Sequence, residues 1–279
     1  MTSPLRLLNA WIDHQRLAER RRQVEWQLGV IFRQPVTLRP TLSGGGFDRI
    51  YLAHEDSLRA KILASVRMNV PGRDRPAKEP HLPRLALTGE DRIHREAHAY
   101  RQLSPLGIAP RLIARSEFYL ANHWLPWPRL SDVLRHHSHL LWDLLPVALD
   151  AIREMHETGV VHMDLNCGNL LVAPNFQSVV VIIDFEFAPL RSMITFDQQR
   201  FDYLRLAHNL LKPRRGREAA FQQPERFVEL FARYVPETGF GIPDAMDTAW
   251  FQRVVEHDVI RDGFEDIFGV LDSESRMIR

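Results

Sequence analysis

Residues 160–172 read Val-Val-His-Met-Asp-Leu-Asn-Cys-Gly-Asn-Leu-Leu-Val, an apolar pair, a polar loop and a second apolar segment. The loop carries Asp164 and Asn169, and the aliphatic run 179–183 that follows ends at Asp184. A buried strand over that run would place the carboxylate of Asp184 at its end, so we expect the three polar side chains to converge. Hard oxygen ligands of this kind suit Mg²⁺, and Asp164 would then accept the proton of a hydroxyl group.

The order and spacing of these residues resemble the catalytic segments of the protein-kinase-like superfamily, over about residues 40–210. The resemblance implies that Asp164 is the catalytic base and that Asn169 and Asp184 are the Mg²⁺ ligands. It implies a structural role for His162. The fold that it implies is a bilobal α+β fold, in which ATP lies between an antiparallel sheet with one helix and a mostly helical lobe.

The same resemblance extends to the N-terminal half of the chain. Residues 43–48 resemble a glycine-rich phosphate loop, in which backbone N–H groups approach phosphate oxygens. The glycines of this loop are Gly44, Gly45 and Gly46. Lys61 resembles the strand lysine that contacts the α- and β-phosphates, and Glu96 resembles its ion-pair partner on a helix.

The distribution of apolar, proline and basic residues predicts three parts. We expect an accessory helix in residues 1–35, an N-terminal lobe in 36–122 and a C-terminal lobe in 123–279. Residues 64–88 contain four prolines among several basic residues, which predicts a mobile loop. A buried stripe at helical spacing runs from Leu141 to Met155 and is closed by Gly159, and further helices are expected around 200–212, 224–235 and 243–258.

Composition limits the class of protein and of partner. The 279 residues are 45% hydrophobic and 25% charged, with a formal net charge of +1, which is typical of a globular protein and does not favour nucleic acid as a partner. The single cysteine, Cys167, excludes an intrachain disulfide framework and fits a reducing compartment. Neither a secretion signal nor a span long enough for a bilayer is visible, so we expect a cytoplasmic protein. Basic residues beside Trp11 leave open a peripheral contact of the N-terminal helix with the inner face of a membrane.

Departures from the protein-kinase pattern bear on the substrate. Arg49 stands in place of the third loop glycine, Asn166 in place of the usual lysine, and Glu186 in place of the glycine of Asp-Phe-Gly. No Ala-Pro-Glu segment follows. These features argue against a conventional protein kinase. The loop around Asp164 resembles lipopolysaccharide-core sugar kinases and RIO-like kinases, whereas residues 183–188 are also similar to choline and aminoglycoside kinases; the short tail after residue 184 favours the first group.

The resemblance therefore implies an enzyme that uses ATP and Mg²⁺ to transfer the γ-phosphoryl group to a hydroxyl-bearing acceptor. We expect a sugar or a lipid-linked saccharide as the acceptor. Two alternatives stay open: an atypical Ser/Thr protein kinase, and a nucleotide-binding pseudokinase that acts as a scaffold without catalysis.

Overall fold

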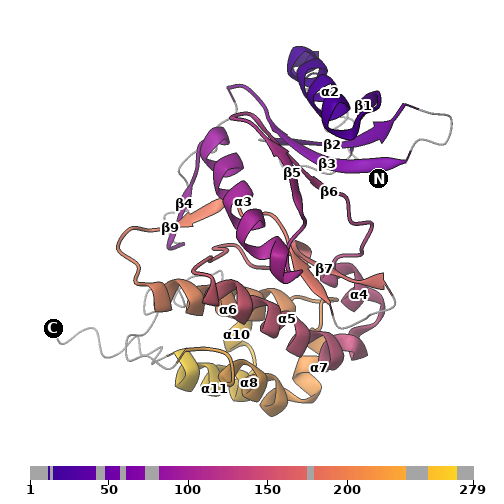
Figure 1. Cartoon of the computed structure of the whole chain (residues 1–279). Helices are drawn as coiled ribbons and strands as arrows, with labels where there is room; N and C mark the ends of the chain where they lie inside the picture. Colours follow the sequence, from indigo (N-terminus) through magenta and orange to yellow (C-terminus); the bar gives the residue numbers. More distant parts are fainter. Residues whose placement is uncertain are drawn as a thin grey trace. The chain divides into compact units, whose positions relative to one another are not determined.

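The computed structural model describes residues 12, 15–41, 48–56, 61–72, 82–174, 179–236 and 251–268. The chain divides into two compact units (Figure 1). Unit 1 comprises Met1–Pro76 and Ala86–Pro126, and unit 2 comprises Ala77–Leu85 and Trp127–Arg279. Antiparallel strands and helices are both present, which confirms the expected α+β class.

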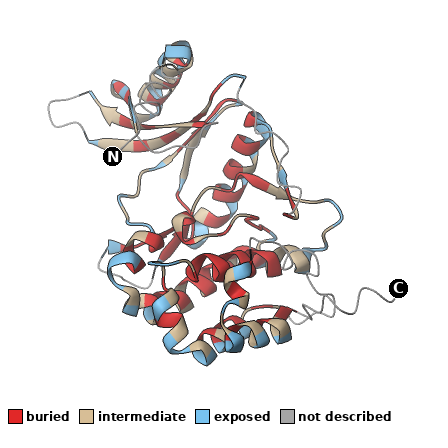
Figure 2. Ribbon diagram, turned by 180° about the vertical axis from the view of Figure 1, so that it is seen from behind, coloured by how far each residue is buried: buried red, intermediate tan, exposed pale blue. Residues whose placement is uncertain are grey.

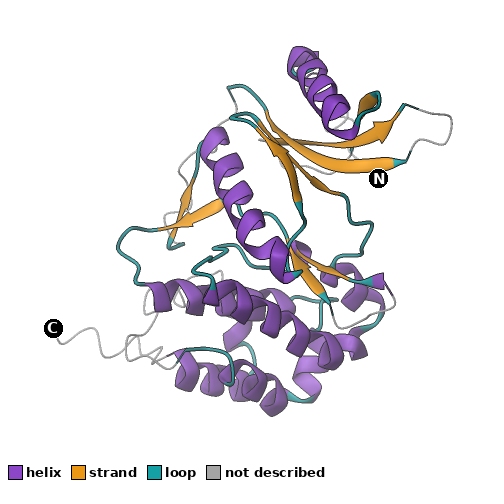
Figure 3. Ribbon diagram, viewed as in Figure 1, coloured by secondary structure: helices purple, strands orange, loops and turns teal. Residues whose placement is uncertain are grey.

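Unit 1 is built on a five-stranded sheet with the order β1-β2-β3-β6-β5. Every neighbouring pair in this sheet is antiparallel (Figure 3). The elements of the unit are α2 (Ala18–Phe32), β1 (Val36–Pro40), β2 (Asp48–Glu55), β3 (Ile62–Asn69), α3 (Gly89–Leu103), η1 (Ser104–Leu106), β5 (Leu112–Arg115) and β6 (Tyr119–His123).

The two faces of β3 have different partners. Ala64, Val66 and Met68 are fully buried and belong to one hydrophobic cluster with Val24 and Leu28 of α2. Because successive side chains of a strand point to opposite faces, the residues between them face the other side of the sheet. Helix α3 contacts β3, β5 and β6. The sheet of unit 1 is therefore a platform for two helices, and the odd-numbered side chains of β3 are available to α3.

Helix α3 begins with a side-chain cap. The hydroxyl of Thr88 accepts a hydrogen bond from the backbone N–H of Asp91 at 3.2 Å, which satisfies one of the unpaired donors of the first turn. Ile93 and Glu96 lie on the buried side of the helix. The buried face of the helix therefore carries a carboxylate.

The structure corrects the mobile loop predicted over residues 64–88. Strand β3 continues to Asn69, and a further strand, β4, covers Arg84–Ala86. Residues 73–81 of this segment lie outside the described residues. The strand persists because β2 and β6 supply hydrogen bonds on both of its edges, and the first proline, Pro71, comes only after it ends.

Unit 2 is mostly helical. Its elements are α4 (Leu130–His136), η2 (Ser138–Leu140), α5 (Leu141–Glu157), η3 (Cys167–Asn169), β7 (Leu170–Val172), β8 (Val180–Ile182), β9 (Phe187–Pro189), α6 (Thr195–Leu210), α7 (Arg217–Gln222), α8 (Pro224–Ala232), α10 (Gln252–Val255) and α11 (Asp258–Phe268). Strand β7 pairs with β8, and β4 pairs with β9. The two small pairs are the only sheets among the described residues of this unit.

Two helices form the centre of unit 2. The predicted stripe of α5, from Leu141 to Met155, is buried, and Gly159 follows the helix with a φ of 79°, which a glycine adopts without strain. Helix α6 is buried on all sides from Arg200 to Leu210 (Figure 2). Because that run contains charged and polar residues, each of them requires a partner inside the protein.

The C-terminal helices differ from the single helix predicted over 243–258. Residues 237–250 lie outside the described residues, α10 ends at Val255, and α11 starts at Asp258. The rings of Phe264 and Phe227 stack at 6.0 Å between α11 and α8. The apolar pattern of the chain thus continues beyond residue 258, and aromatic packing against α8 places the longer helix there.

Candidate active site

Asp202, near the centre of α6, anchors the polar loop of residues 162–169. Its carboxylate is fully buried. Oδ2 accepts a hydrogen bond from the backbone N–H of His162, and Oδ1 accepts one from that of Met163, each at 2.7 Å. Met163 has a φ of 65°, a left-handed conformation that costs a residue with a side chain about 1 kcal/mol or more. The two charge-assisted bonds offset this cost, so Asp202 braces the backbone of the loop.

His162 connects this loop to the strand that precedes Asp184. Its Nδ1 accepts a hydrogen bond from the backbone N–H of Asp164 at 3.2 Å, so Nε2 carries the proton and donates to the carbonyl of Ile183 at 2.9 Å. The ring packs on Phe185, with 4.8 Å between centroids. Both ring nitrogens are engaged by the backbone, as expected for a structural histidine.

Asn169 and Asp184 lie at the same end of the β7–β8 pair. The strands are antiparallel, and the backbone N–H of Ile183 donates to the carbonyl of Asn169 at 3.0 Å. Asn169 Nδ2 donates to the carbonyl of Asp164 at 3.1 Å. Because the amide nitrogen is used in this way, the amide oxygen is the atom that Asn169 can offer to a cation. An amide oxygen beside a carboxylate fits Mg²⁺, which needs only one or two carboxylates when nucleotide phosphates supply further ligands.

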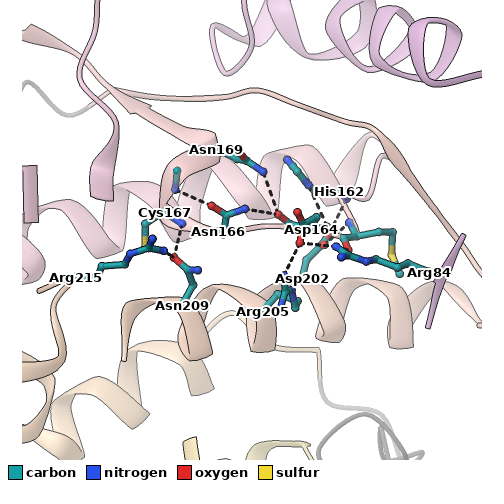
Figure 4. Close-up of polar contacts among 12 residues, drawn as sticks. Arg84, His162, Asp164, Asn166, Cys167, Asn169, Asp202, Arg205, Asn209 and Arg215 are labelled. Atoms are coloured by element: carbon teal, nitrogen blue, oxygen red, sulfur yellow. Dashed lines mark hydrogen bonds and ion pairs between the residues drawn. The ribbon is translucent and has the colours of Figure 1, made fainter. Parts of the chain in front are cut away.

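The carboxylate of Asp164 is held by two arginines (Figure 4). Arg84 Nη1 and Arg205 Nη2 both lie 2.5 Å from Asp164 Oδ1. The guanidinium of Arg84 also donates to the carbonyl of Met163 at 3.3 Å and stacks over the ring of Phe187 at 3.8 Å. These contacts fix the orientation of the Asp164 side chain.

Neither arginine is among the site residues predicted from the sequence. Arg84 was placed in a loop, far along the chain from Asp164. Arg205 carried a local signal, because it lies three residues after Asp202 and therefore on the same face of α6. A helix that presents Asp202 to the backbone of the loop also presents Arg205 to the side chain of Asp164.

Asn166 shapes the loop from inside. Its Nδ2 donates to the carbonyl of Asp164 at 2.9 Å, and its Oδ1 accepts from the backbone N–H of Gly168 at 2.8 Å. A Cβ at position 168 would lie 2.9 Å from that Oδ1, so any side chain there would displace Asn166. The asparagine found where protein kinases have lysine thus serves the backbone geometry of this loop.

The next residue of the loop, Cys167, is buried. Burial raises the pKa of its thiol to about 12, so the thiol stays protonated and unreactive at neutral pH. Its backbone N–H donates to Oδ1 of Asn209 at 3.1 Å, so Asn209 is a third residue of α6 in contact with the loop.

Unit 1 contains a buried group of two arginines and two carboxylates. Arg67 Nε lies 3.2 Å from Glu96 Oε2, and Tyr100 donates its hydroxyl hydrogen to Glu96 Oε1 at 2.6 Å. Arg92 binds Asp48 through both Nη2, at 2.8 Å, and Nε, at 3.3 Å. Arg67 Nη1 also approaches Asp48 at 3.8 Å, which joins the two pairs into one network.

This network corrects the predicted pairing of Lys61 with Glu96. Lys61 is exposed and precedes the first residue of β3. Arg67 lies six positions further along the chain, or about 20 Å away at 3.3 Å per residue. Arg67 is on the face of β3 that α3 covers, and it takes the position next to Glu96. Gly44, Gly45 and Gly46 lie outside the described residues.

Part of the chain is similar to a known protein family. Residues 144–230, about a third of the chain, match the profile of the lipopolysaccharide kinase (Kdo/WaaP) family. Among solved structures, the kinase domain of PknI from Mycobacterium tuberculosis, a double mutant, is similar to this chain at 16% identity, with a TM-score of 0.43. That similarity covers 73% of this chain and 75% of the PknI chain.

The matched segment runs from α5 to α8 and contains the residues of the site that unit 2 supplies, with the exception of Arg84. It includes the loop with Asp164 and Asn169, the strand that ends before Asp184, and the helix that carries Asp202 and Arg205. The family match and the arrangement of these residues support a phosphotransferase of the protein-kinase-like superfamily.

Proposed function

We propose that the protein transfers the γ-phosphoryl group of ATP to a hydroxyl group of a saccharide. The observation that carries this proposal is the placement of Asp164 and Asn169 on one loop and of Asp184 at the same end of the β7–β8 pair, within the segment that matches the lipopolysaccharide kinase family. Phosphoryl transfer requires mainly positioning and charge neutralisation, and this group of residues offers both.

Asp164 is the residue that we assign to the acceptor. Its carboxylate would orient the hydroxyl group and accept its proton. Arg84 and Arg205 hold that carboxylate in one orientation, so the acceptor meets a base with a fixed direction. Asn169 and Asp184 would hold Mg²⁺, which supplies positive charge to the nucleotide phosphates when it is bound.

For the nucleotide, we propose that Arg67, in place of Lys61, contacts the α- and β-phosphates. The basis is its pairing with Glu96 on α3, the arrangement that fixes the strand cation in protein kinases. A guanidinium can bind phosphate through two parallel hydrogen bonds. Gly44, Gly45 and Gly46 remain the residues proposed to approach the phosphates through their backbone.

The test uses the purified full chain with ATP, Mg²⁺ and a panel of saccharides. Thermal unfolding with saturating ATP and Mg²⁺ should show a stabilisation of about 2.7 kcal/mol at 100 times the dissociation constant. Asp184→Ala should lose the Mg²⁺-dependent part. Asp164→Asn should keep that stabilisation but transfer no phosphate. Transfer by Asp164→Asn at the wild-type rate would contradict the proposal.

Two other functions are separated by the same assay. An atypical Ser/Thr protein kinase would place the label of γ-labelled ATP in protein rather than in a glycan. A nucleotide-binding scaffold would show the thermal shift and no transfer to any acceptor. The arginine at the position of the strand lysine is the feature that favours the scaffold.

We also propose a peripheral membrane contact for α2. Among the described residues, no helix has the length and hydropathy required to cross a bilayer. Trp26 and Val30 are 70% and 61% exposed, and with Arg22 they form one stripe at four-residue spacing. Trp26→Ala should reduce cosedimentation with anionic vesicles, whereas Val259→Ala, an exposed apolar residue of α11, should not. Equal sedimentation of all three proteins would contradict the contact.

A further inference from the structure

Cations gather beside the loop of residues 162–169 in unit 2. They come from β4, from the end of α6, from the turn that follows it, and from α10. The members of this basic cluster are Arg84, Arg205, Lys212, Arg215 and Arg253. The first two bind Asp164, so the loop already supplies one carboxylate to two arginines.

Two of the other three cations donate to uncharged side chains. Arg215 Nη1 donates to Asn209 Oδ1 at 2.8 Å, and the same oxygen accepts the backbone N–H of Cys167 at 3.1 Å (Figure 4). One asparagine oxygen therefore connects the guanidinium of Arg215 to the loop. Arg253 Nη1 lies 3.1 Å from His208 Nε2 and donates to it, which requires the imidazole to be neutral.

The charges in this region act on one another. Burial lowers the pKa of His208 to about 3, and the nearby charges of Arg253, Lys212 and Arg205 act in the same direction, so the ring is neutral near pH 7. Burial lowers the pKa of Lys212, and so do Arg215, Arg205 and Arg253. In the described part of the chain, no carboxylate forms an ion pair with Lys212, Arg215 or Arg253.

Half-buried cations held this close repel one another, and an anion placed among them would relieve the repulsion. We propose that Lys212, Arg215 and Arg253 form a subsite for an anionic group, a phosphate or a carboxylate, that the acceptor carries near its reacting hydroxyl. This inference rests on the proposed function, since it deepens the choice of acceptor at the same loop. It predicts that a neutral saccharide is a poor acceptor.

The first measurement is the binding of inorganic phosphate to the full chain, by calorimetry, with a non-hydrolysable ATP analogue and Mg²⁺ present. Lys212→Gln is the cleanest variant, because the side chain of Lys212 makes no hydrogen bond within the described residues. We expect its dissociation constant for phosphate to rise about tenfold or more, as for the loss of a hydrogen bond to a charged group. Lys212→Arg should restore binding.

Arg214→Gln is the matched control. Arg214 is exposed, and its substitution removes the same charge from the same turn. It should change the dissociation constant by less than about twofold, as expected for an exposed charge. Equal weakening by Arg214→Gln and Lys212→Gln would overturn the subsite and indicate a general effect of charge. Unchanged phosphate binding in Lys212→Gln would also overturn it. So would phosphate binding that the ATP analogue abolishes completely.

A second measurement compares three probes to identify the anion. Glucose 6-phosphate, glucuronate and glucose share a sugar ring and differ in charge, so the tighter of the two anions names the group that the subsite prefers. Tighter binding of glucose than of either anion would contradict the inference. None of these readouts requires phosphoryl transfer, so a failure of the subsite is distinguishable from a failure of the proposed function, which the Mg²⁺-dependent stabilisation by ATP tests by itself.

Discussion

Arg67 on β3 and Glu96 on α3 form an ion pair in which Nε and Oε2 are 3.2 Å apart. The exposed fractions of the two side chains are 14% and 3%, so the pair is shielded from water. Helix α3 covers the face of β3 that is opposite to Val66, and Arg67 lies on that face. The residue of β3 that pairs with the helix carboxylate is therefore Arg67, an arginine rather than the expected lysine.

The first prediction concerns the stability of this network. Arg67→Ala should lower the free energy of unfolding by about 3 kcal/mol, because it leaves the carboxylates of Glu96 and Asp48 with less compensating charge in a buried site. Lys61→Ala should change it by less than about 0.5 kcal/mol, because Lys61 is exposed. Urea denaturation followed by circular dichroism measures both values. An equal loss in the two variants would restore Lys61 as a structural partner.

The parts of the site that are close in sequence could be predicted. Asp164 and Asn169 share one loop, and Asp184 follows the next strand, so spacing alone places them on adjacent segments. The role of Asp202 depends on the burial of α6, because a buried carboxylate requires hydrogen-bond donors inside the protein.

The parts that depend on long-range pairing could not. Arg84 meets Asp164 because β4 pairs with β9, and nothing near Arg84 in the sequence indicates that partner. Arg67 is not predicted as a strand residue, because the prolines after residue 70 indicate a loop. The alternation of Ala64, Val66 and Met68 is the signal that the strand continues. Proline and glycine residues indicate where a chain can turn. The length and register of β3 depend instead on its pairing with β2 and β6.

The second prediction tests the anchor of the loop. Asp202→Asn replaces one acceptor oxygen with an N–H₂ group that faces a backbone donor, so at least one of the 2.7 Å bonds to His162 and Met163 is lost. We expect the free energy of unfolding to fall by about 2 kcal/mol or more. Asp132→Asn is the matched control, because Asp132 forms only an exposed pair with Arg135, worth less than about 1 kcal/mol. Chemical denaturation of the two variants decides, and similar losses would remove the special role of Asp202.

The third prediction uses the contact between Gly168 and Asn166. Gly168→Ala should destabilise the protein by about 1–3 kcal/mol, because its Cβ would lie 2.9 Å from Asn166 Oδ1. Asn166→Ala removes that oxygen together with two hydrogen bonds. Gly168→Ala should therefore cost less in the Asn166→Ala background than in the wild type. A double-mutant cycle of unfolding free energies measures the difference, and strict additivity would show that the two side chains do not compete for space.

The last prediction is a pH dependence at His208. The pKa of this residue falls from its usual value near 6.5 to about 3 in the folded protein, because of burial and then of the neighbouring Arg253, Lys212 and Arg205. A lowered pKa means that the unfolded chain binds a proton that the folded protein rejects. Stability is therefore fully present above pH 6.5 and declines as the pH falls below it, by at most about 1.4 kcal/mol per pH unit. His208→Gln keeps an acceptor for Arg253 and should flatten the decline between pH 7 and pH 5, whereas His98→Gln, at an exposed position of α3, should leave it unchanged. Urea midpoints at four pH values measure the three slopes, and the same slope in wild type and His208→Gln would show that the proton binds elsewhere.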